Sequence, residues 1–236
     1  MCTAQTAELK PANRLLAALS PNTHRRLARS LKHVELEFGQ VLFEPGDAIG
    51  QVYFPNDCLV SLLVAAGNDE PLEVGMVGRE GMVGLSVALG RSSSPVLVLV
   101  QGAGSAMRMS TPRFAAEMKQ HASFRRQLDG CIYVAMTTAM QIAACNRSHP
   151  LAGRLARWLL MVRDRVGRGE FPLTQEFLAR MLGVRRAGVT EAAGELQRRD
   201  LIRYSRGNVE MLDLPGIRAA ACSCYRVIRR LEEGAR

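Results

Sequence analysis

The sequence has 236 residues, enough for two modest domains or one large one. Its hydrophobic fraction of 47% and charged fraction of 22% are ordinary for a soluble globular protein. No apolar run approaches the roughly 20 residues that a membrane span needs, and the first residues lack the apolar core of a signal peptide. These features predict a cytoplasmic protein without a membrane partner.

The net charge of +9 is distributed unevenly along the chain. From Arg147 to the C-terminus there are 18 arginines, no lysine and 10 acidic residues, which gives +8, whereas residues 1–146 contribute +1. Such asymmetry is typical of a protein that binds a polyanion. Solvated arginine-rich helices are the simpler alternative.

The first 110 residues change from helical to strand-like patterning. Residues 12–32 have helical periodicity, interrupted at Ser20-Pro21, where the serine can cap a second helix and the proline can begin it. Residues 33–110 hold short β-rich runs separated by turn sequences such as EPGD (44–47) and GND (67–69). This arrangement predicts an antiparallel β-roll or barrel.

Helical patterning returns at Thr111-Pro112, and a long helical run continues over residues 122–149. A stripe of apolar residues in this run recurs at helical spacing, with small residues in the later turns. Such a stripe packs either on its own domain or against a second copy of the chain, which small residues would let approach closely. The candidate dimer-helix residues are Leu128, Ile132, Ala135, Ala139 and Ile142.

The pattern of residues 175–199 fits a helix-turn-helix. Apolar residues fall where the two helices would face each other, with Ala179 at their close approach and Gly183 at the turn. The next segment, LIRYSRGNVEML, predicts a β-hairpin wing that turns at Gly207-Asn208. An amphipathic helix is predicted before this unit, and one closing helix in the tail.

The second helix of this unit, at about residues 185–199, begins with two adjacent arginines, although the helix dipole favours negative charge at that end. DNA would supply the anion, since arginine donates a bidentate pair to guanine and glutamate accepts from cytosine. Residues at the start of the first helix and in the wing are expected to contact phosphates of the DNA backbone. The candidate DNA-binding residues are Thr174, Gln175, Arg185, Arg186, Thr190, Glu191, Arg203 and Arg206.

The six cysteines are scattered and form no CxxC motif. Cys222 and Cys224 have no histidine nearby in the sequence, and Cys145 and His149, one helical turn apart, have no apparent third ligand. The histidines are expected to be surface or cap residues rather than haem ligands. We therefore expect no metal site and no cofactor.

The layout over about residues 12–212 resembles the cyclic-AMP receptor / fumarate–nitrate regulator (Crp/Fnr) family. The segments that carry the resemblance are VLFEPGDAIGQVYF, VGREGMVG and LTQEFLARMLGVRRAGVTEAAGELQRRDLI. It implies an α+β chain with an antiparallel β-roll of cyclic-nucleotide-binding type (12–121), a dimerisation helix (122–149) and a winged helix-turn-helix (150–236). It further implies a homodimer on a near-palindromic double-stranded DNA operator, with RNA polymerase and an unidentified small-molecule effector as partners.

The sequence departs from the family at two places. In the recognition helix, Arg186 matches a family arginine, but Ala187 stands in the family's glutamate position and Glu191 in that of the later arginine. The usual half-site is therefore not expected. In the roll, alignment from the following strand places Ser94-Pro95 where cyclic-AMP-binding members have an arginine followed by serine or threonine, and proline has no N–H to donate.

By resemblance, the candidate ligand-binding residues are Gly78, Glu80, Gly81, Arg91 and Ser92. Iron–sulfur members carry an N-terminal cysteine cluster, and only Cys2 precedes residue 58 here, which excludes that group. A small-molecule-binding module or scaffold without transcriptional output is the alternative function. An enzyme is not supported, because no Ser/His/Asp order, phosphate loop or paired-carboxylate cleft is apparent.

Overall fold

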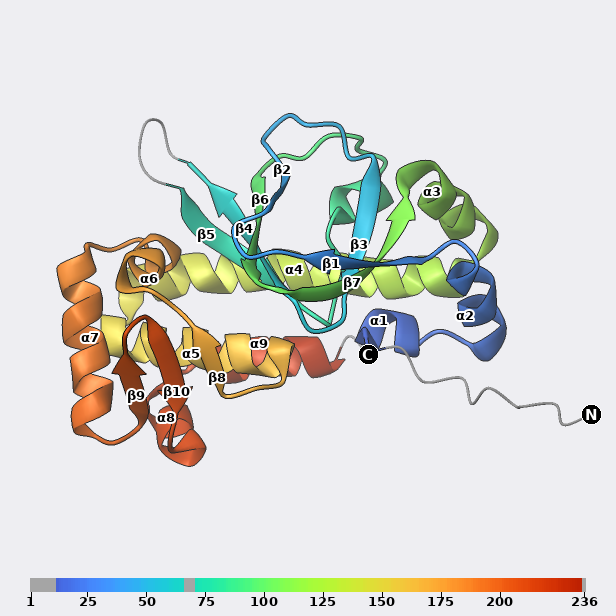
Figure 1. Ribbon diagram of the computed structural model, residues 1–236. Helices are drawn as coiled ribbons and strands as arrows, with labels where there is room; N and C mark the ends of the chain where they lie inside the picture. Colours follow the sequence, from blue (N-terminus) through green and yellow to red (C-terminus); the bar gives the residue numbers. More distant parts are fainter. Residues whose placement is uncertain (1–11, 66–70, 235–236) are drawn as a thin grey trace, which may run out of the picture.

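The computed structural model describes residues 12–65 and 71–234, so Cys2 and the turn expected at 67–69 lie outside the described residues. A β-rich N-terminal part and a mixed C-terminal part lie side by side, and one long helix runs along both (Figure 1). The N-terminal elements are α1 (Arg14–Ala17), α2 (Pro21–Ala28), β1 (Lys32–Leu36), β2 (Val41–Phe43), β3 (Gln51–Pro55), β4 (Leu59–Val64), β5 (Leu72–Val77), the 3₁₀ helix η1 (Leu85–Leu89), β6 (Leu97–Gly102), β7 (Gly104–Ser110) and α3 (Thr111–Gln120).

Two antiparallel sheets form the predicted β-roll, with strand orders β1-β7-β3 and β2-β6-β4-β5. Side chains alternate along each strand, so that Val52 and Phe54 of β3 point into the same core as Val60 of β4 and Val98 and Val100 of β6. The apolar side chains of α1 and α2 belong to this core as well. The roll therefore closes on one hydrophobic core with the N-terminal helices packed against it.

The start of the described chain is fixed by two caps. Ser20 begins α2 as the sequence predicts, and its hydroxyl accepts a hydrogen bond from the backbone N–H of Thr23 at 3.3 Å. Asn13 caps α1, and its side-chain amide donates to the carbonyls of Pro55 and Gly81 at 2.8 and 2.9 Å. Since Asn13 is fully buried, these bonds anchor the first helix in the roll.

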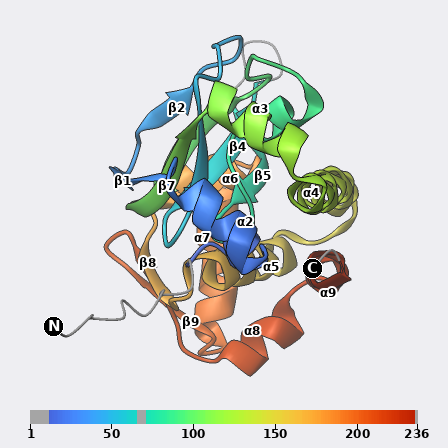
Figure 2. The ribbon, with the colours of Figure 1, turned by 90° about the vertical axis from the view of Figure 1, so that its right-hand side faces the viewer.

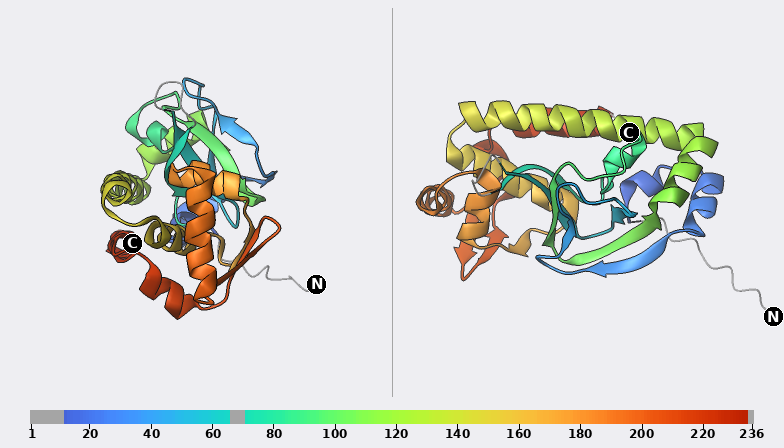
Figure 3. Two further views of the ribbon diagram at one scale, coloured as in Figure 1. Left: turned by 90° about the vertical axis from the view of Figure 1, so that its left-hand side faces the viewer. Right: turned by 90° about the horizontal axis from the view of Figure 1, so that it is seen from above.

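Helix α4 (Ala122–Ser148) is 27 residues long and spans the junction of the two parts. It contacts α3, η1 and β5 on the roll, and α9 (Cys224–Gly234) lies beside it (Figures 2 and 3). Its outer face carries three large exposed side chains, Tyr133, Met136 and Met140, which are 53%, 50% and 62% exposed. The roll and α9 therefore cover only one side of this helix.

By length and composition, α4 is also apolar enough to cross a membrane, contrary to the expectation from the sequence. The mean hydropathy of its most apolar 18-residue window is 1.3, and 22% of that window is buried. One helix of this kind is weak evidence for a membrane span, because the core helix of a soluble protein passes the same test. Packing against the roll and α9 accounts for the buried part of its apolar surface.

The C-terminal elements are α5 (Leu151–Val166), β8 (Glu170–Pro172), α6 (Gln175–Leu182), α7 (Arg186–Arg198), β9 (Ile202–Ser205), β10 (Asn208–Met211), α8 (Leu214–Ala220) and α9. The amphipathic helix α5 is central, with Trp158 and Leu159 fully or almost fully buried. The core around them also contains Leu59, Leu63 and Met76 of the roll. Helix α5 therefore packs between the roll and the rest of the C-terminal part.

The tail forms two helices where the sequence predicts one. Helix α8 ends at Ala220, because Ala221 takes an extended conformation and the N–H of Cys222 donates to the carbonyl of Gly153 in α5 at 3.1 Å. A Cβ on Gly153 would lie 3.4 Å from the Cys222 nitrogen, so glycine allows this close approach. The break sends α9 back along α4 (Figure 3).

Candidate nucleic-acid interface

Helices α6 and α7 form the predicted helix-turn-helix, and its turn depends on Gly183. This residue ends α6 in the left-handed conformation, with φ 61° and ψ 47°. A Cβ at Gly183 would lie 2.6 Å from Cδ1 of Leu72 in β5. At the other end of α6, the hydroxyl of Thr174 accepts a hydrogen bond from the N–H of Phe177 at 3.1 Å. Both ends of α6 are thus fixed by local chemistry.

The apolar contacts expected within this unit are confirmed. They belong to the core around Trp158, which holds both helices against α5. Because these positions are buried, the remaining face of α7 must point outward. The buried contact residues are Leu178, Ala179, Leu182, Val189 and Ala192, with Val184 partly buried beside them.

The outward face of α7 is positively charged at its start. Arg185 and Arg186 are exposed, and α7 has neither a side-chain cap nor an acidic residue in its first turn. The dipole of α7 therefore meets positive rather than negative charge within the chain. Thr190 and Glu191 continue the exposed face one turn later, and the Thr190 hydroxyl donates to Oε1 of Gln175 at 2.9 Å. Polar groups of both helices thus share one surface.

The wing is a three-stranded antiparallel sheet with strand order β8-β10-β9. Its turn lies one residue earlier than predicted, because the central pair is Arg206 and Gly207, with φ 50° and 75°. Two positive φ angles are what a type I′ turn requires. Arg206 is therefore exposed at the tip, and it forms no ion pair within residues 12–65 and 71–234. The hydroxyl of Tyr204 donates to the carbonyl of Leu173 at 2.8 Å and ties the wing to the start of α6.

The other wing arginine is already paired. Nη1 of Arg203 lies 2.6 Å from Oε2 of Glu210 on the facing strand, and both side chains are exposed. An exposed pair of this kind adds little stability. It does lower the charge that β9 offers to a polyanion, so Arg206 is the stronger phosphate candidate of the two.

Several arginines of the basic C-terminal half do not lie on this surface. Arg154, Arg157 and Arg165 of α5 are 7%, 3% and 5% exposed. Arg229 of α9 pairs with Asp164 at 3.2 Å. The charge asymmetry of the sequence therefore overstates the charge available to DNA.

The helix-turn-helix adjoins the roll at its edge strand. Arg185 and Arg186 line a hollow of about 640 Å³ together with Pro71, which precedes β5. The rings of Phe38 and Phe177, one from each part, have centroids 6.0 Å apart. A change in the position of β5 would therefore change the position of the turn before α7.

Glu80, one of the expected ligand-binding residues, forms an ion pair with a residue of α5 instead. Oε1 of Glu80 lies 3.0 Å from Nε of the buried Arg165, whose Nη2 lies 2.7 Å from Glu232 of α9. A Cβ on Gly78 would lie 2.6 Å from Cβ of Arg165, so this glycine permits the contact. Gly81 lies in the same loop, whose glycine-rich sequence here serves as a docking site for α5.

The rest of the expected ligand set lies elsewhere. Arg91 and Ser92 are exposed after η1, and within the described residues no hydrogen bond or ion pair joins them to Glu80. Ser94 is buried, and its hydroxyl donates to the carbonyl of Val96 at 2.7 Å. In this arrangement Glu80 is engaged by Arg165 while Arg91 is exposed, so their binding of one ligand stays a prediction.

The expected dimer residues on α4 divide into two groups. Leu128 and Ile142 are 0% and 7% exposed and belong to the chain's own cores, and Ile132 is partly buried against the roll. Ala135 and Ala139 are exposed. Leu128 and Ile142 are therefore engaged within the chain, because these two positions of the stripe face its own cores, whereas Ala135 and Ala139 stay candidates for a dimer face.

Comparison with known proteins agrees with this fold. Residues 153–220 match the family described as the Crp-like helix-turn-helix domain. FixK2 from Bradyrhizobium japonicum has a TM-score of 0.70 at 11% identity, covering 82% of this chain and 98% of its own. The c-di-GMP-responsive global regulator CLP from Xanthomonas campestris has a TM-score of 0.65 at 16% identity, covering 82% and 100%. A Crp/Fnr-family regulator from Thermus thermophilus has a TM-score of 0.58 at 23% identity, covering 80% and 98%. A search of curated proteins gives no significant match.

Proposed function

We propose that the protein is a homodimeric regulator that binds DNA sequence-specifically, because residues 153–220 match the Crp-like helix-turn-helix domain and the fold is similar to that of solved Crp/Fnr-type regulators. The observation that carries the proposal is the face of α7, where exposed Arg185 and Arg186 precede Thr190 and Glu191 while the opposite face is buried. Helix α7 enters the major groove, and the wing contacts the DNA backbone.

Base reading follows from the side chains at the start of α7. Arg186 donates to O6 and N7 of a guanine, and Glu191, one turn further along, accepts from N4 of a cytosine. Ala187 leaves room between them and offers a methyl contact to thymine. Thr174 and Gln175 position the first helix on phosphates.

The proposed dimer forms along the exposed face of α4. Tyr133, Met136 and Met140 are spaced three and four residues apart, so they project from one side of the helix. Ala139 and Ala143, both exposed, lie beside them and let a second helix approach closely. A two-fold pair of chains would present two α7 helices to half-sites about 34 Å apart, one turn of DNA.

An effector would act through the contact between the roll and the helix-turn-helix. Leu72 of β5 touches the turn at Gly183, and Glu73 binds α5, so a change in β5 alters the setting of α7. A ligand of the roll can shift this setting only if it binds the two arrangements with different affinity. RNA polymerase is the further proposed partner, as the Crp/Fnr resemblance implies.

Selection of DNA fragments bound by the purified protein, with and without cell extract, tests this proposal. We expect enrichment of one near-palindromic sequence, bound with an affinity that falls steeply with salt. Enrichment only with extract would identify a diffusible effector. No enrichment under either condition would contradict the proposal and favour a binding module without transcriptional output.

A further inference from the structure

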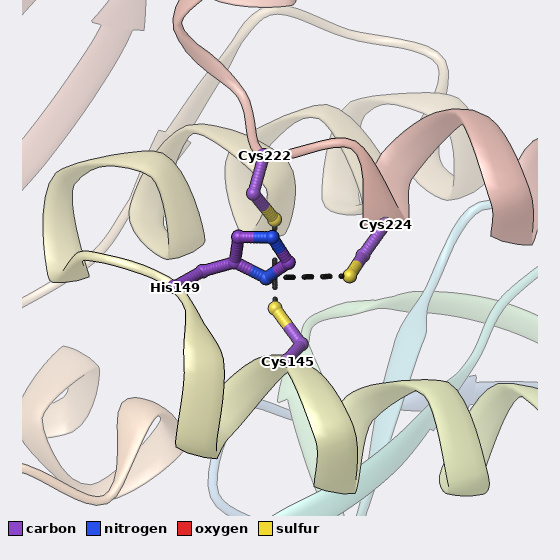
Figure 4. Close-up of side chains that lie close together, drawn as sticks. All are labelled: Cys145, His149, Cys222 and Cys224. Carbon is purple, nitrogen blue, oxygen red and sulfur yellow. Dashed lines mark hydrogen bonds between the residues drawn. The ribbon is translucent and has the colours of Figure 1, made fainter.

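Three cysteines and a histidine from distant parts of the chain converge at the junction of α4 and α9. Cys145 and His149 come from the end of α4, Cys222 from the break before α9, and Cys224 from its first residue (Figure 4). The expectation that neither pair would find further ligands is therefore wrong. Both pairs meet because the tail breaks at residues 221–223 and α9 returns along α4.

The spacing of the four ligand atoms fits one tetrahedral ion. Sγ of Cys145 and Sγ of Cys222 lie 3.4 Å apart, Sγ of Cys224 lies 3.5 Å from Nδ1 of His149, and all four atoms lie within 4.8 Å of one another. With Zn–S near 2.3 Å and Zn–N near 2.0 Å, ligand atoms at tetrahedral corners are about 3.5–3.8 Å apart. The two distances of 3.4 and 3.5 Å therefore differ from the tetrahedral values by a few tenths of an ångström or less, and the other pairs are at most 4.8 Å apart.

The sulfur atoms also have the outer partners that metal-bound thiolates require. The side-chain amide of Gln141 donates to Sγ of Cys224 at 3.0 Å, and the backbone N–H of Cys224 donates to the sulfur of Cys222. Bonds of this kind orient ligands and stabilise negative charge on sulfur. Cys145, Cys222 and Cys224 form a small buried cluster separate from the two main cores, so they are shielded from solvent.

A buried positive charge lies beside this cluster. Arg157 is 3% exposed, its Nη1 contacts Sδ of Met161 at 3.1 Å, and it forms no ion pair with a carboxylate within the described residues. Its guanidinium acts electrostatically on both Cys145 and Cys222. A zinc ion with three thiolates and a neutral imidazole has a net charge of −1, which Arg157 would balance.

We propose that Cys145, His149, Cys222 and Cys224 bind one Zn²⁺ ion per chain. Three thiolates and an imidazole are a preferred ligand set for zinc, and four protein ligands make a closed, structural site. An iron–sulfur cluster does not fit, because it spreads its protein ligands over two or more irons, and ligand atoms on different irons stand further apart than the 4.8 Å found here. The ion fastens the start of α9 to the end of α4 and so fixes the break in the tail.

The site also lies at the hinge between α4 and the helix-turn-helix part. Only Pro150 separates His149 from α5, so the chain can change direction at this point. The ion also links the start of α9 to the last turn of α4. The angle between α4 and α5 is therefore set both by the chain and by the metal.

Metal content and a cobalt spectrum test the proposal without reference to DNA binding. The full chain is purified in a phosphine reductant, and zinc and iron are measured by mass spectrometry. The metal-free protein is then titrated with Co²⁺ under anaerobic conditions. We expect about one zinc per chain, and with cobalt the sulfur charge-transfer band and intense visible bands of a tetrahedral thiolate site.

The variant Cys222→Ser/Cys224→Ser is expected to lose the bound zinc and the cobalt bands, whereas Cys131→Ser, which changes a cysteine of α4 outside the cluster, keeps both. Circular dichroism of each variant shows whether it folds, and His149→Ala provides a second test by weakening the bands without removing a thiol. Three results would each overturn the proposal: wild-type protein that binds neither ion, cobalt bands that persist in the double cysteine variant, or iron with acid-labile sulfide in place of zinc.

Discussion

Trp158 of α5 donates its indole N–H to Oε1 of Glu73 in β5 at 2.8 Å, and both side chains are buried. The other carboxylate oxygen of Glu73 accepts from the hydroxyl of Ser61 at 2.8 Å. Burial raises the pKa of Glu73 to about 7, although the bonds from Ser61 and Trp158 and the charge of Arg157 oppose the shift. The central helix of the DNA-binding part is thus held to the roll by a carboxyl group that changes charge near neutral pH.

Glu73 should make the stability of the protein depend on pH. Its folded pKa of about 7 lies above the ordinary value of 4.5. Between these values the native state keeps a proton that the unfolded chain has released, so stability from this group is present at low pH and is lost as the pH rises toward 7. Glu73→Gln should remove that loss, and the variant should gain up to about 3 kcal/mol relative to wild type across this range.

Urea unfolding of the two proteins at a series of pH values measures this difference. Glu195→Gln, which changes an exposed glutamate of α7, is the matched control and should follow the wild-type curve. Parallel curves for wild type and Glu73→Gln would show that Glu73 titrates normally.

Two glycines of the helix-turn-helix should respond to alanine with opposite signs. Gly183→Ala places a Cβ in the left-handed region and against Leu72, so we expect a loss of about 1–3 kcal/mol in unfolding free energy. Gly194 lies inside α7, where a Cβ would meet only the flexible end of Arg198 at 3.4 Å. Gly194→Ala should therefore stabilise the protein by about 0.5–1 kcal/mol. Equal effects in thermal or urea unfolding would contradict the assignment of the turn.

Structural features that depend on the local spacing of residues could be predicted from the sequence. Features that depend on contacts between distant segments could not. The helix-turn-helix follows from apolar positions a few residues apart around Gly183. The cluster of Cys145 and Cys222 joins residues 77 positions apart, and it depends on a break in the tail that no glycine or proline between α8 and α9 signals. The contact of Glu80 with Arg165 likewise arises only when α5 packs on the roll.

For helix α4, the sequence predicts the helix but not which of its faces is exposed. Its periodicity predicts a helix with one apolar stripe, but in the structure Leu128 and Ile142 of that stripe are buried in the chain's own cores while Ala135 and Ala139 are exposed. The exposed face instead contains Met136 and Met140, which a search for the most regular apolar repeat passes over. Rotation of a helix about its axis is set by tertiary packing, so periodicity alone could not assign the dimer face.

The exposed face of α4 should hold the proposed dimer together. Met136→Glu/Met140→Glu places two like charges per chain at the interface, and we expect a monomer by size-exclusion chromatography with light scattering. Val41→Glu/Leu212→Glu makes the same charge change at two other exposed apolar positions and should stay dimeric. A dimer that survives the methionine substitutions would place the interface elsewhere.

Cyclic AMP should not alter DNA binding. Glu80 is engaged by Arg165, and Ser94-Pro95 offers a buried hydroxyl and a residue without an N–H in place of a phosphate contact. Isothermal titration of the protein with cyclic AMP should show no heat of binding. Binding at micromolar concentration would mean that the roll opens and that Glu80 exchanges its partner.

Arg206 in the wing should increase the affinity for DNA of any sequence. Arg206→Asn keeps a residue that tolerates the left-handed conformation and removes one charge. We expect weaker binding to selected and unrelated DNA alike, with the slope of log affinity against log salt smaller by about 0.9. An effect confined to the selected sequence would indicate base contact by the wing.

Fluorescence anisotropy of a selected DNA fragment, titrated with wild type and with Arg185→Ala/Arg186→Ala, tests the central claim most directly. Arg25→Ala/Arg29→Ala removes the same charge from exposed positions at and just after α2, at the opposite end of the molecule from α7 (Figure 1). We expect the α7 variant to bind the selected fragment no better than unrelated DNA while its oligomeric state is unchanged, and the α2 variant to keep its preference. Undiminished preference in the α7 variant would show that α7 does not read DNA.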